Sequence, residues 1–160
     1  MSLKHIPATR LLHLEPILVL HIEDDLDDAS LLEIFTRRES SSKISIVHTP
    51  LLNQALALYQ SLHKQLEIRG GYQKEPIIVV DFNFGSDDSR ETVASIRKYE
   101  REANLVRARS ILFSGLDFTS CDSSYLPVKD LHDFTVCKNE RDGYKQVSRK
   151  IVNLYQSLSS

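Results

Sequence analysis

Five short apolar runs alternate with longer stretches of helical periodicity along this chain. The runs are residues 16–22, 44–47, 77–80, 110–113 and 134–137. They are too short and too continuously apolar for exposed helices, and they favour strands buried on both faces of a sheet. Between them, apolar residues recur at spacings of three and four, as in helices with one buried face. Alternating strands and helices predict right-handed βαβ units and a parallel sheet.

The pattern therefore predicts an α/β protein with a flavodoxin-like, doubly wound, five-stranded parallel sheet and helices on both faces. We expect residues 1–15 to form an N-terminal extension and residues 16–160 to form a single domain, because 160 residues suffice for one well-buried core. A short helix is expected between Ser123 and Leu131. In the third helix, Val93 and Ile96 are predicted to be buried, and residues 97–102 to form a solvated charged face.

Helix boundaries are predicted from local residue chemistry. Pro50 is expected in the first turn of the second helix, where proline is favoured. Gly70 and Gly71 should end that helix. Asp25, Asp27 and Asp28 are predicted to cap or solvate the start of the first helix, where carboxylates complement free N–H groups and the helix dipole.

Composition excludes several functional classes. A net charge of −2 gives no electrostatic case for direct nucleic-acid binding. The apolar run at residues 17–20 is too short to span a membrane, and no signal-peptide pattern precedes it. The two cysteines give no disulfide framework, and the six histidines lack zinc-site spacing. We therefore expect a cytoplasmic protein that binds neither membrane nor nucleic acid.

Chemistry-bearing residues gather where the predicted strands end. Glu23 and Asp24 follow the first strand, Asp81 the third, Ser114 the fourth and Lys138 the fifth. These carboxyl ends share one edge of a parallel sheet, where ligands bind in open α/β folds. Two carboxylates about 4 Å apart repel by roughly 4 kcal/mol at an effective dielectric near 20. One lysine does not neutralise three acids, whereas Mg²⁺ prefers such oxygen ligands. A carboxylate beside Mg²⁺ and a lysine is suited to attack phosphorus.

The ordered set Asp24, Asp81, Ser114 and Lys138 resembles the receiver domain of two-component response regulators. The resemblance extends over about residues 16–157, and the stretch 97–109 is similar to receivers attached to hybrid sensor kinases. It implies that the protein accepts a phosphoryl group from a phosphohistidine and then switches partner binding, without being an enzyme for other substrates. The implied partners are a sensor histidine kinase or a histidine phosphotransfer protein, and a homodimer is a further option.

The resemblance also assigns roles to individual residues. Asp81 would be the phosphoacceptor. Glu23 and Asp24 would hold Mg²⁺ together with Asp81 and the backbone carbonyl of Asn83. The alternative metal pair, Asp24 with Asp25, stays open at this point. The remaining two strand-end residues, Ser114 and Lys138, would contact the phosphoryl group.

Two alternatives stay open, one from departures from the family pattern and one from a second resemblance. Asn139 follows Lys138 where the family usually has proline, and Thr135 stands where many members carry a switch aromatic. One alternative is therefore a pseudo-receiver, which binds proteins without being phosphorylated. The other is a phosphatase of the haloacid dehalogenase type, because Asp25-Leu26-Asp27 resembles that family's first motif. No acidic pair matching its last motif follows Lys138, and in that alternative Asp25 would be essential instead of Asp81.

Overall fold

The structure, a computed structural model, describes residues 17–40, 44–85, 87–115 and 131–158. The expected N-terminal extension and nearly all of the helix expected between Ser123 and Leu131 lie outside these residues. Five parallel strands form one sheet in the order β2-β1-β3-β6-β7. They are β1 (Ile17–Ile22), β2 (Ile44–Thr49), β3 (Ile77–Val80), β6 (Ser110–Ser114) and β7 (Phe134–Cys137).

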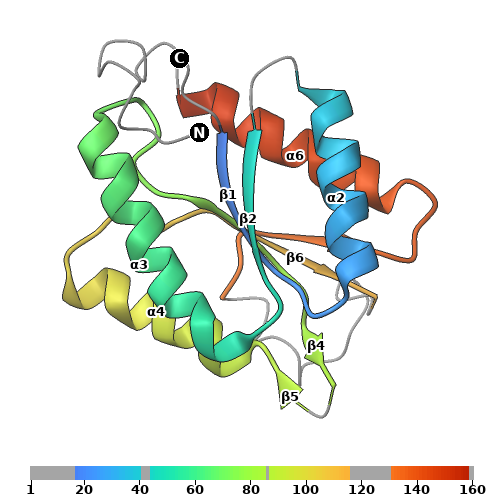
Figure 1. The fold of residues 1–160 in the computed structure, drawn as a ribbon, viewed down its shortest axis with the longest axis horizontal. Coiled ribbons are helices and arrows are strands. Elements are labelled where there is room, and N and C mark those ends of the chain that lie inside the picture. Colours follow the sequence, from blue (N-terminus) through green and yellow to red (C-terminus); the bar gives the residue numbers. More distant parts are fainter. Residues whose placement is uncertain (1–16, 41–43, 86, 116–130, 159–160) are drawn as a thin grey trace.

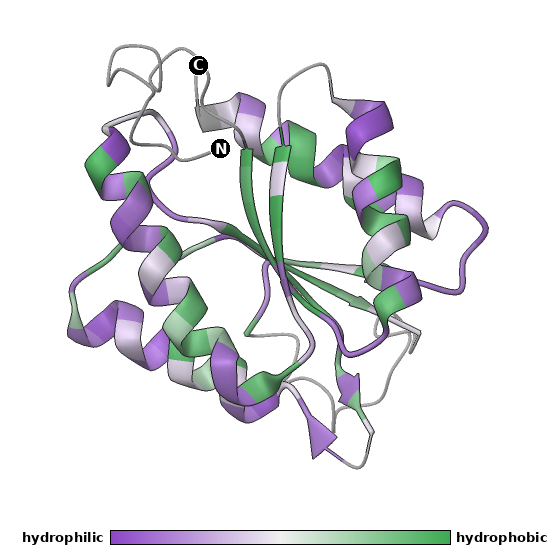
Figure 2. Ribbon diagram, in the orientation of Figure 1, coloured by the Kyte–Doolittle hydropathy of each residue, from purple (hydrophilic) through white to green (hydrophobic). Residues whose placement is uncertain are grey.

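The helices cover both faces of the sheet, as Figure 1 shows. One face carries α2 (Leu26–Glu39) and α6 (Gly143–Leu158), and the other carries α3 (Leu52–Arg69) and α4 (Arg90–Glu102). The central strands β1 and β3 are buried along their whole length, which explains their continuous apolar sequences. The hydrophobic strands stand out between amphipathic helices in Figure 2. The predicted doubly wound, flavodoxin-like fold is thus confirmed.

Two separate cores lie on the two faces of the sheet, because successive side chains of a strand point to opposite sides. Leu18, Leu20 and Ile22 of β1 pack in the core beneath α3 and α4. Ile17 and Val19 pack in the other core, with Val147 and Ile151 of α6. The sheet, with its strand ends, therefore lies between the two layers of helices (Figure 1). Among the described residues, no helix has the length and apolar character needed to cross a membrane.

One helix start differs from the sequence prediction, and another confirms it for one of the three predicted residues, Asp25. The second helix begins at Leu52 rather than at Pro50, because the Thr49 hydroxyl accepts a hydrogen bond from the Leu51 N–H (3.2 Å) and forms a turn before the helix. In α2, the N-cap is Asp25, whose side chain accepts hydrogen bonds from the N–H groups of Asp27 and Asp28. Gly70, with a φ of 68°, ends α3 as predicted.

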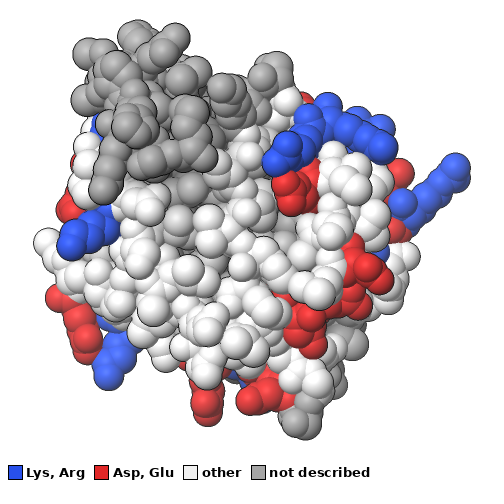
Figure 3. All heavy atoms as spheres, viewed as in Figure 1, with Lys and Arg blue, Asp and Glu red and all other residues white. Residues whose placement is uncertain are grey.

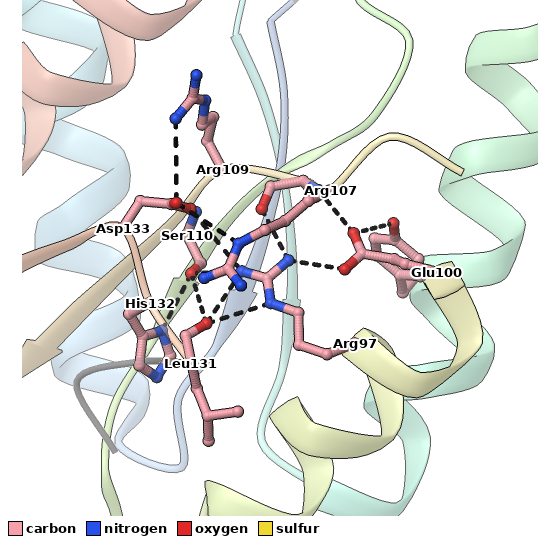
Figure 4. Close-up of polar contacts among 10 residues, drawn as sticks. Arg97, Glu100, Arg107, Arg109, Ser110, Leu131, His132 and Asp133 are labelled. Atoms are coloured by element: carbon pink, nitrogen blue, oxygen red, sulfur yellow. Dashed lines mark hydrogen bonds and ion pairs between the residues drawn. The ribbon is translucent and has the colours of Figure 1, made fainter. Parts of the chain in front are cut away.

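The solvated charged face predicted for residues 97–102 is wrong for two of its members. Arg97 and Glu100 are only 4% and 3% exposed. Figure 4 shows Arg97 between Glu100 and the start of β6, where it donates to Glu100 Oε1 (2.8 Å) and Ser110 Oγ (2.7 Å). Both residues continue the helical stripe of Val93 and Ile96, so they face inward. Their burial is compatible with charge because each is paired and hydrogen-bonded.

Candidate functional site

Three acids meet at the carboxyl edge of the sheet. Glu23 follows β1 and Asp81 follows β3, which are paired neighbours in the sheet. Glu23, Asp24 and Asp81 each offer an oxygen, and these three atoms lie within 4.8 Å of one another. Such a set of hard oxygen donors fits a divalent cation such as Mg²⁺. The structure thus brings together all three side chains predicted for the metal site.

Lys138 enters the same site from the end of β7. Its ammonium group lies 2.5 Å from Glu23 Oε1, 3.0 Å from Asp28 Oδ2 and 3.4 Å from Asp81 Oδ2. Its backbone N–H donates to the carbonyl of Ser114 (2.7 Å), which ties the ends of β6 and β7 together. Lys138 therefore brings one positive charge to a group of three acidic side chains.

The burial of the site shapes its electrostatics. Glu23 is fully buried, whereas the side chains of Asp81 and Lys138 are 12% and 10% exposed. Burial raises the pKa of Glu23 to about 8, and the charge of Asp81 adds to this rise although the hydrogen bond from Lys138 opposes it. Burial alone would lower the pKa of Lys138, but Glu23 and Asp81 outweigh it and raise that pKa. The site therefore carries an excess of negative charge that a cation would relieve.

Asp81 and Asp24 differ in their access to solvent. Asp81 is held by a hydrogen bond from the N–H of Phe82 to its Oδ1 (2.8 Å), while its other oxygen faces Lys138. Asp24 is exposed and lines a cavity of about 440 Å³ with Leu51, Phe84 and Gly85. Figure 3 shows acidic side chains gathered near the start of α2. A ligand can therefore reach the acids from the Asp24 side.

Two further predicted site residues, Asn83 and Ser114, lie at or just after strand ends of the same sheet. Asn83 stands in the short strand β4 (Asn83–Phe84), which pairs antiparallel with β5 (Asp87–Asp88). Ser114 is the buried last residue of β6. The metal-binding carbonyl of Asn83 and the phosphate-binding hydroxyl of Ser114 stay predictions.

Asn139 connects the two loops beside Lys138. Its side-chain amide donates to the carbonyl of Gly115 (3.0 Å), and no described peptide bond is cis. A side chain at position 115 would crowd this amide, because a Cβ there would lie 3.3 Å from Asn139 Nδ2. Asn139 thus closes the loop by a hydrogen bond in place of the proline expected from the family pattern.

The sequence prediction missed two residues of the site, Asp28 and Tyr144. Asp28 was predicted to cap α2, but Asp25 caps the helix, and the Asp28 carboxylate instead contacts Lys138 and accepts a hydrogen bond from the Tyr144 hydroxyl (2.6 Å). The spacing of four residues could have indicated this position. Asp28 lies on the same face of the helix as Leu32 and Thr36, which are both buried. Since Asp25 is engaged as the cap, the geometry favours Glu23 with Asp24 as the acidic pair.

Comparison with known proteins adds to this geometry. No family model matches the sequence, and no curated protein matches it either. Several solved structures are similar. A point mutant of the receiver domain of the histidine kinase CKI1 from Arabidopsis thaliana has a TM-score of 0.67 at 19% identity, over 95% of this chain and 97% of that one.

Two further structures carry ligands or a modification. The CKI1 receiver domain complexed with Mg²⁺ and BeF₃⁻ has a TM-score of 0.60 at 23% identity, covering 88% of this chain and 93% of that one. The phosphorylated cyanobacterial phytochrome response regulator RcpA has a TM-score of 0.60 at 18% identity, covering 91% and 95%. The described chain therefore has the fold of receiver domains.

Proposed function

We propose that this protein is a phosphoacceptor receiver domain in a two-component phosphorelay. The observation that carries the proposal is the cluster of Glu23, Asp24 and Asp81 at the sheet edge, with the Lys138 ammonium 3.4 Å from Asp81. This arrangement supplies a nucleophile, a metal-binding acid pair and a fixed positive charge. The partners would be a sensor histidine kinase or a histidine phosphotransfer protein, and the cell compartment the cytoplasm.

The phosphoryl transfer requires a few definite changes. A carboxylate oxygen of Asp81 attacks the phosphorus of a phosphohistidine, the new O–P bond forms as the P–N bond breaks, and the imidazole leaves with the electron pair. Glu23, Asp24 and Asp81, with the carbonyl of Asn83, would hold Mg²⁺, which when bound compensates negative charge on the phosphoryl oxygens. Lys138 orients and neutralises the same oxygens.

Acetyl phosphate or beryllofluoride, each with Mg²⁺, tests the proposal directly on the wild-type protein. We expect the intact mass to rise by one phosphoryl group with acetyl phosphate, and the modified peptide to contain Asp81. A protein that binds Mg²⁺ but takes no adduct would contradict the phosphoacceptor role. A protein that binds neither would be a pseudo-receiver. Phosphatase turnover that is lost in Asp25→Ala but kept in Asp81→Ala would instead support the haloacid dehalogenase alternative.

The raised pKa of Glu23 makes Mg²⁺ binding depend on pH. The folded-state pKa of Glu23, about 8, lies above its ordinary value of 4.5, so the folded protein keeps this proton between these two pH values. The free energy of unfolding of the metal-free protein therefore falls as the pH rises through this range. A bound cation requires the carboxylate, so metal binding must expel that proton. We expect the apparent Mg²⁺ affinity to increase roughly tenfold per pH unit between about pH 6 and 7 and to level off above about 8.

Calorimetric titration with Mg²⁺ across this pH range measures the effect. The matched control is Glu23→Gln, which keeps the size of the side chain and has no proton to release. Its affinity should be weaker but nearly independent of pH. A wild-type affinity that is flat from about pH 6 to 8 would contradict a protonated Glu23 in the apo protein.

A further inference from the structure

One carboxylate of the site has no task in the proposed phosphoryl transfer. Asp28 lies in the first turn of α2, and its side chain is 27% exposed. Its two oxygens have different partners: Oδ2 contacts the Lys138 ammonium at 3.0 Å, and Oδ1 accepts the hydrogen bond from the Tyr144 hydroxyl at 2.6 Å. Asp28 therefore links the strand-end lysine to helix α6.

Asp28 competes with Asp81 for Lys138. An ammonium group has three N–H donors, and here three carboxyl groups surround it. The contact with Asp81 is the longest, at 3.4 Å, compared with 3.0 Å for Asp28 and 2.5 Å for Glu23. In the unmodified protein the ammonium is thus held closer to Asp28 and Glu23 than to the proposed phosphoacceptor.

Tyr144 holds Asp28 from the opposite side and is itself fixed by packing. Its ring stacks on Phe35 of α2, with centroids 5.7 Å apart, and forms a T-shaped contact with Phe113 of β6, with centroids 4.9 Å apart. The Lys138 ammonium lies 5.4 Å from the same Phe113 ring. Because Tyr144 belongs to the first turn of α6, a change in its hydrogen bond is a change at the start of that helix.

We propose that Asp28 and Tyr144 are positioning residues for Lys138, and that they couple the site to α6. This inference rests on the proposed function. When Asp81 carries a phosphoryl group, its additional anionic oxygens are the stronger acceptors, and the ammonium moves from Asp28 toward them. Asp28 is then free to change its hydrogen bond with Tyr144, so the first turn of α6 reports the modification.

Beryllofluoride binding in Mg²⁺ tests the positioning role through Asp28→Asn. This change keeps the side-chain size but removes the charge that competes for Lys138, so we expect beryllofluoride to bind roughly tenfold more tightly than to wild type. The matched control is Asp27→Asn, which removes an acid from the same helical turn. The Asp27 side chain is exposed, and only its backbone N–H donates to the N-cap residue Asp25. The beryllofluoride affinity of Asp27→Asn should therefore stay within about twofold of wild type.

Amide NMR spectra test the coupling through Tyr144→Phe, which keeps the ring contacts and removes only the hydroxyl. In wild type, beryllofluoride should shift the amide signals of Phe82, beside Asp81, and of Tyr144 and Lys145. In Tyr144→Phe the Phe82 shift should persist, while the shifts at positions 144 and 145 should be lost. A merely structural role of the hydroxyl would not separate these two responses.

Three results would overturn the inference. They are an unchanged or weaker beryllofluoride affinity in Asp28→Asn, undiminished α6 shifts in Tyr144→Phe, and a change in Asp27→Asn as large as that in Asp28→Asn. A wild-type protein that takes no adduct would overturn the proposed function, and the positioning role with it. Adduct formation without these variant effects would overturn the positioning role alone.

Discussion

Replacement of Asp81 by asparagine is expected to abolish phosphoryl acceptance while leaving the protein folded. Asparagine has nearly the same shape and can still accept the hydrogen bond from the Phe82 N–H, but its amide is not a nucleophile. The charge of Asp81 raises the pKa of Glu23, so its removal also relieves repulsion inside the site. We therefore expect the free energy of unfolding to stay the same or to rise by on the order of 1 kcal/mol.

Intact-mass analysis after incubation with acetyl phosphate and Mg²⁺ measures the loss, and urea unfolding measures the stability. Asp87→Asn is the matched control, because Asp87 is an exposed acid of the neighbouring short strand β5. It should accept the phosphoryl group as wild type does. If Asp81→Asn still gained a phosphoryl group at wild-type stoichiometry, the acceptor would be another carboxylate of the cluster.

The strand ends could be predicted from the sequence because two simple regularities coincide there. Continuous apolar runs mark buried parallel strands, and parallel topology brings their carboxyl ends to one edge. Glu23, Asp81 and Lys138 follow such runs directly, so their convergence required no knowledge of side-chain conformations. The same logic could not place Ser114's hydroxyl or the carbonyl of Asn83, whose roles depend on loop geometry.

The charged residues on the helices were predicted less well, for a physical reason. We predicted exposure for charged residues on helices, because charged side chains usually face water. Asp28, Arg97 and Glu100 nevertheless lie on the same helix faces as the buried residues of α2 and α4. Each is accommodated by partners from distant parts of the chain, such as Lys138 and Tyr144 for Asp28 or Tyr59 for Glu100. The helical spacing of these residues indicated the face on which they lie, but only their tertiary partners make it favourable to remove such charges from water, wholly for Arg97 and Glu100 and partly for Asp28.

Breaking the buried ion pair of Arg97 and Glu100 is expected to cause a large loss of stability. Arg97 donates to Glu100, to Ser110 and to the carbonyls of Ala108 (2.8 Å) and Leu131 (3.1 Å). Arg97→Met would fill much of the same space but leave the Glu100 carboxylate buried without its cation. Removing one partner of such a pair costs about 3–5 kcal/mol, so we expect a loss of that size in urea unfolding.

Two comparisons separate lost charge pairing from lost packing. Arg101→Met changes an exposed arginine of the same helix and should alter stability by no more than about 0.5 kcal/mol. Glu100→Gln keeps an acceptor for the Tyr59 hydroxyl, which lies 2.8 Å from Glu100. Alone it should destabilise, but added to Arg97→Met it should restore part of the loss, because it removes the uncompensated charge. Strictly additive losses would contradict a charge-paired network.

Since Ser110 begins β6 and Ser114 ends it, the network lies at the opposite strand end from Asp81. Folded Arg97→Met protein should therefore still accept the phosphoryl group.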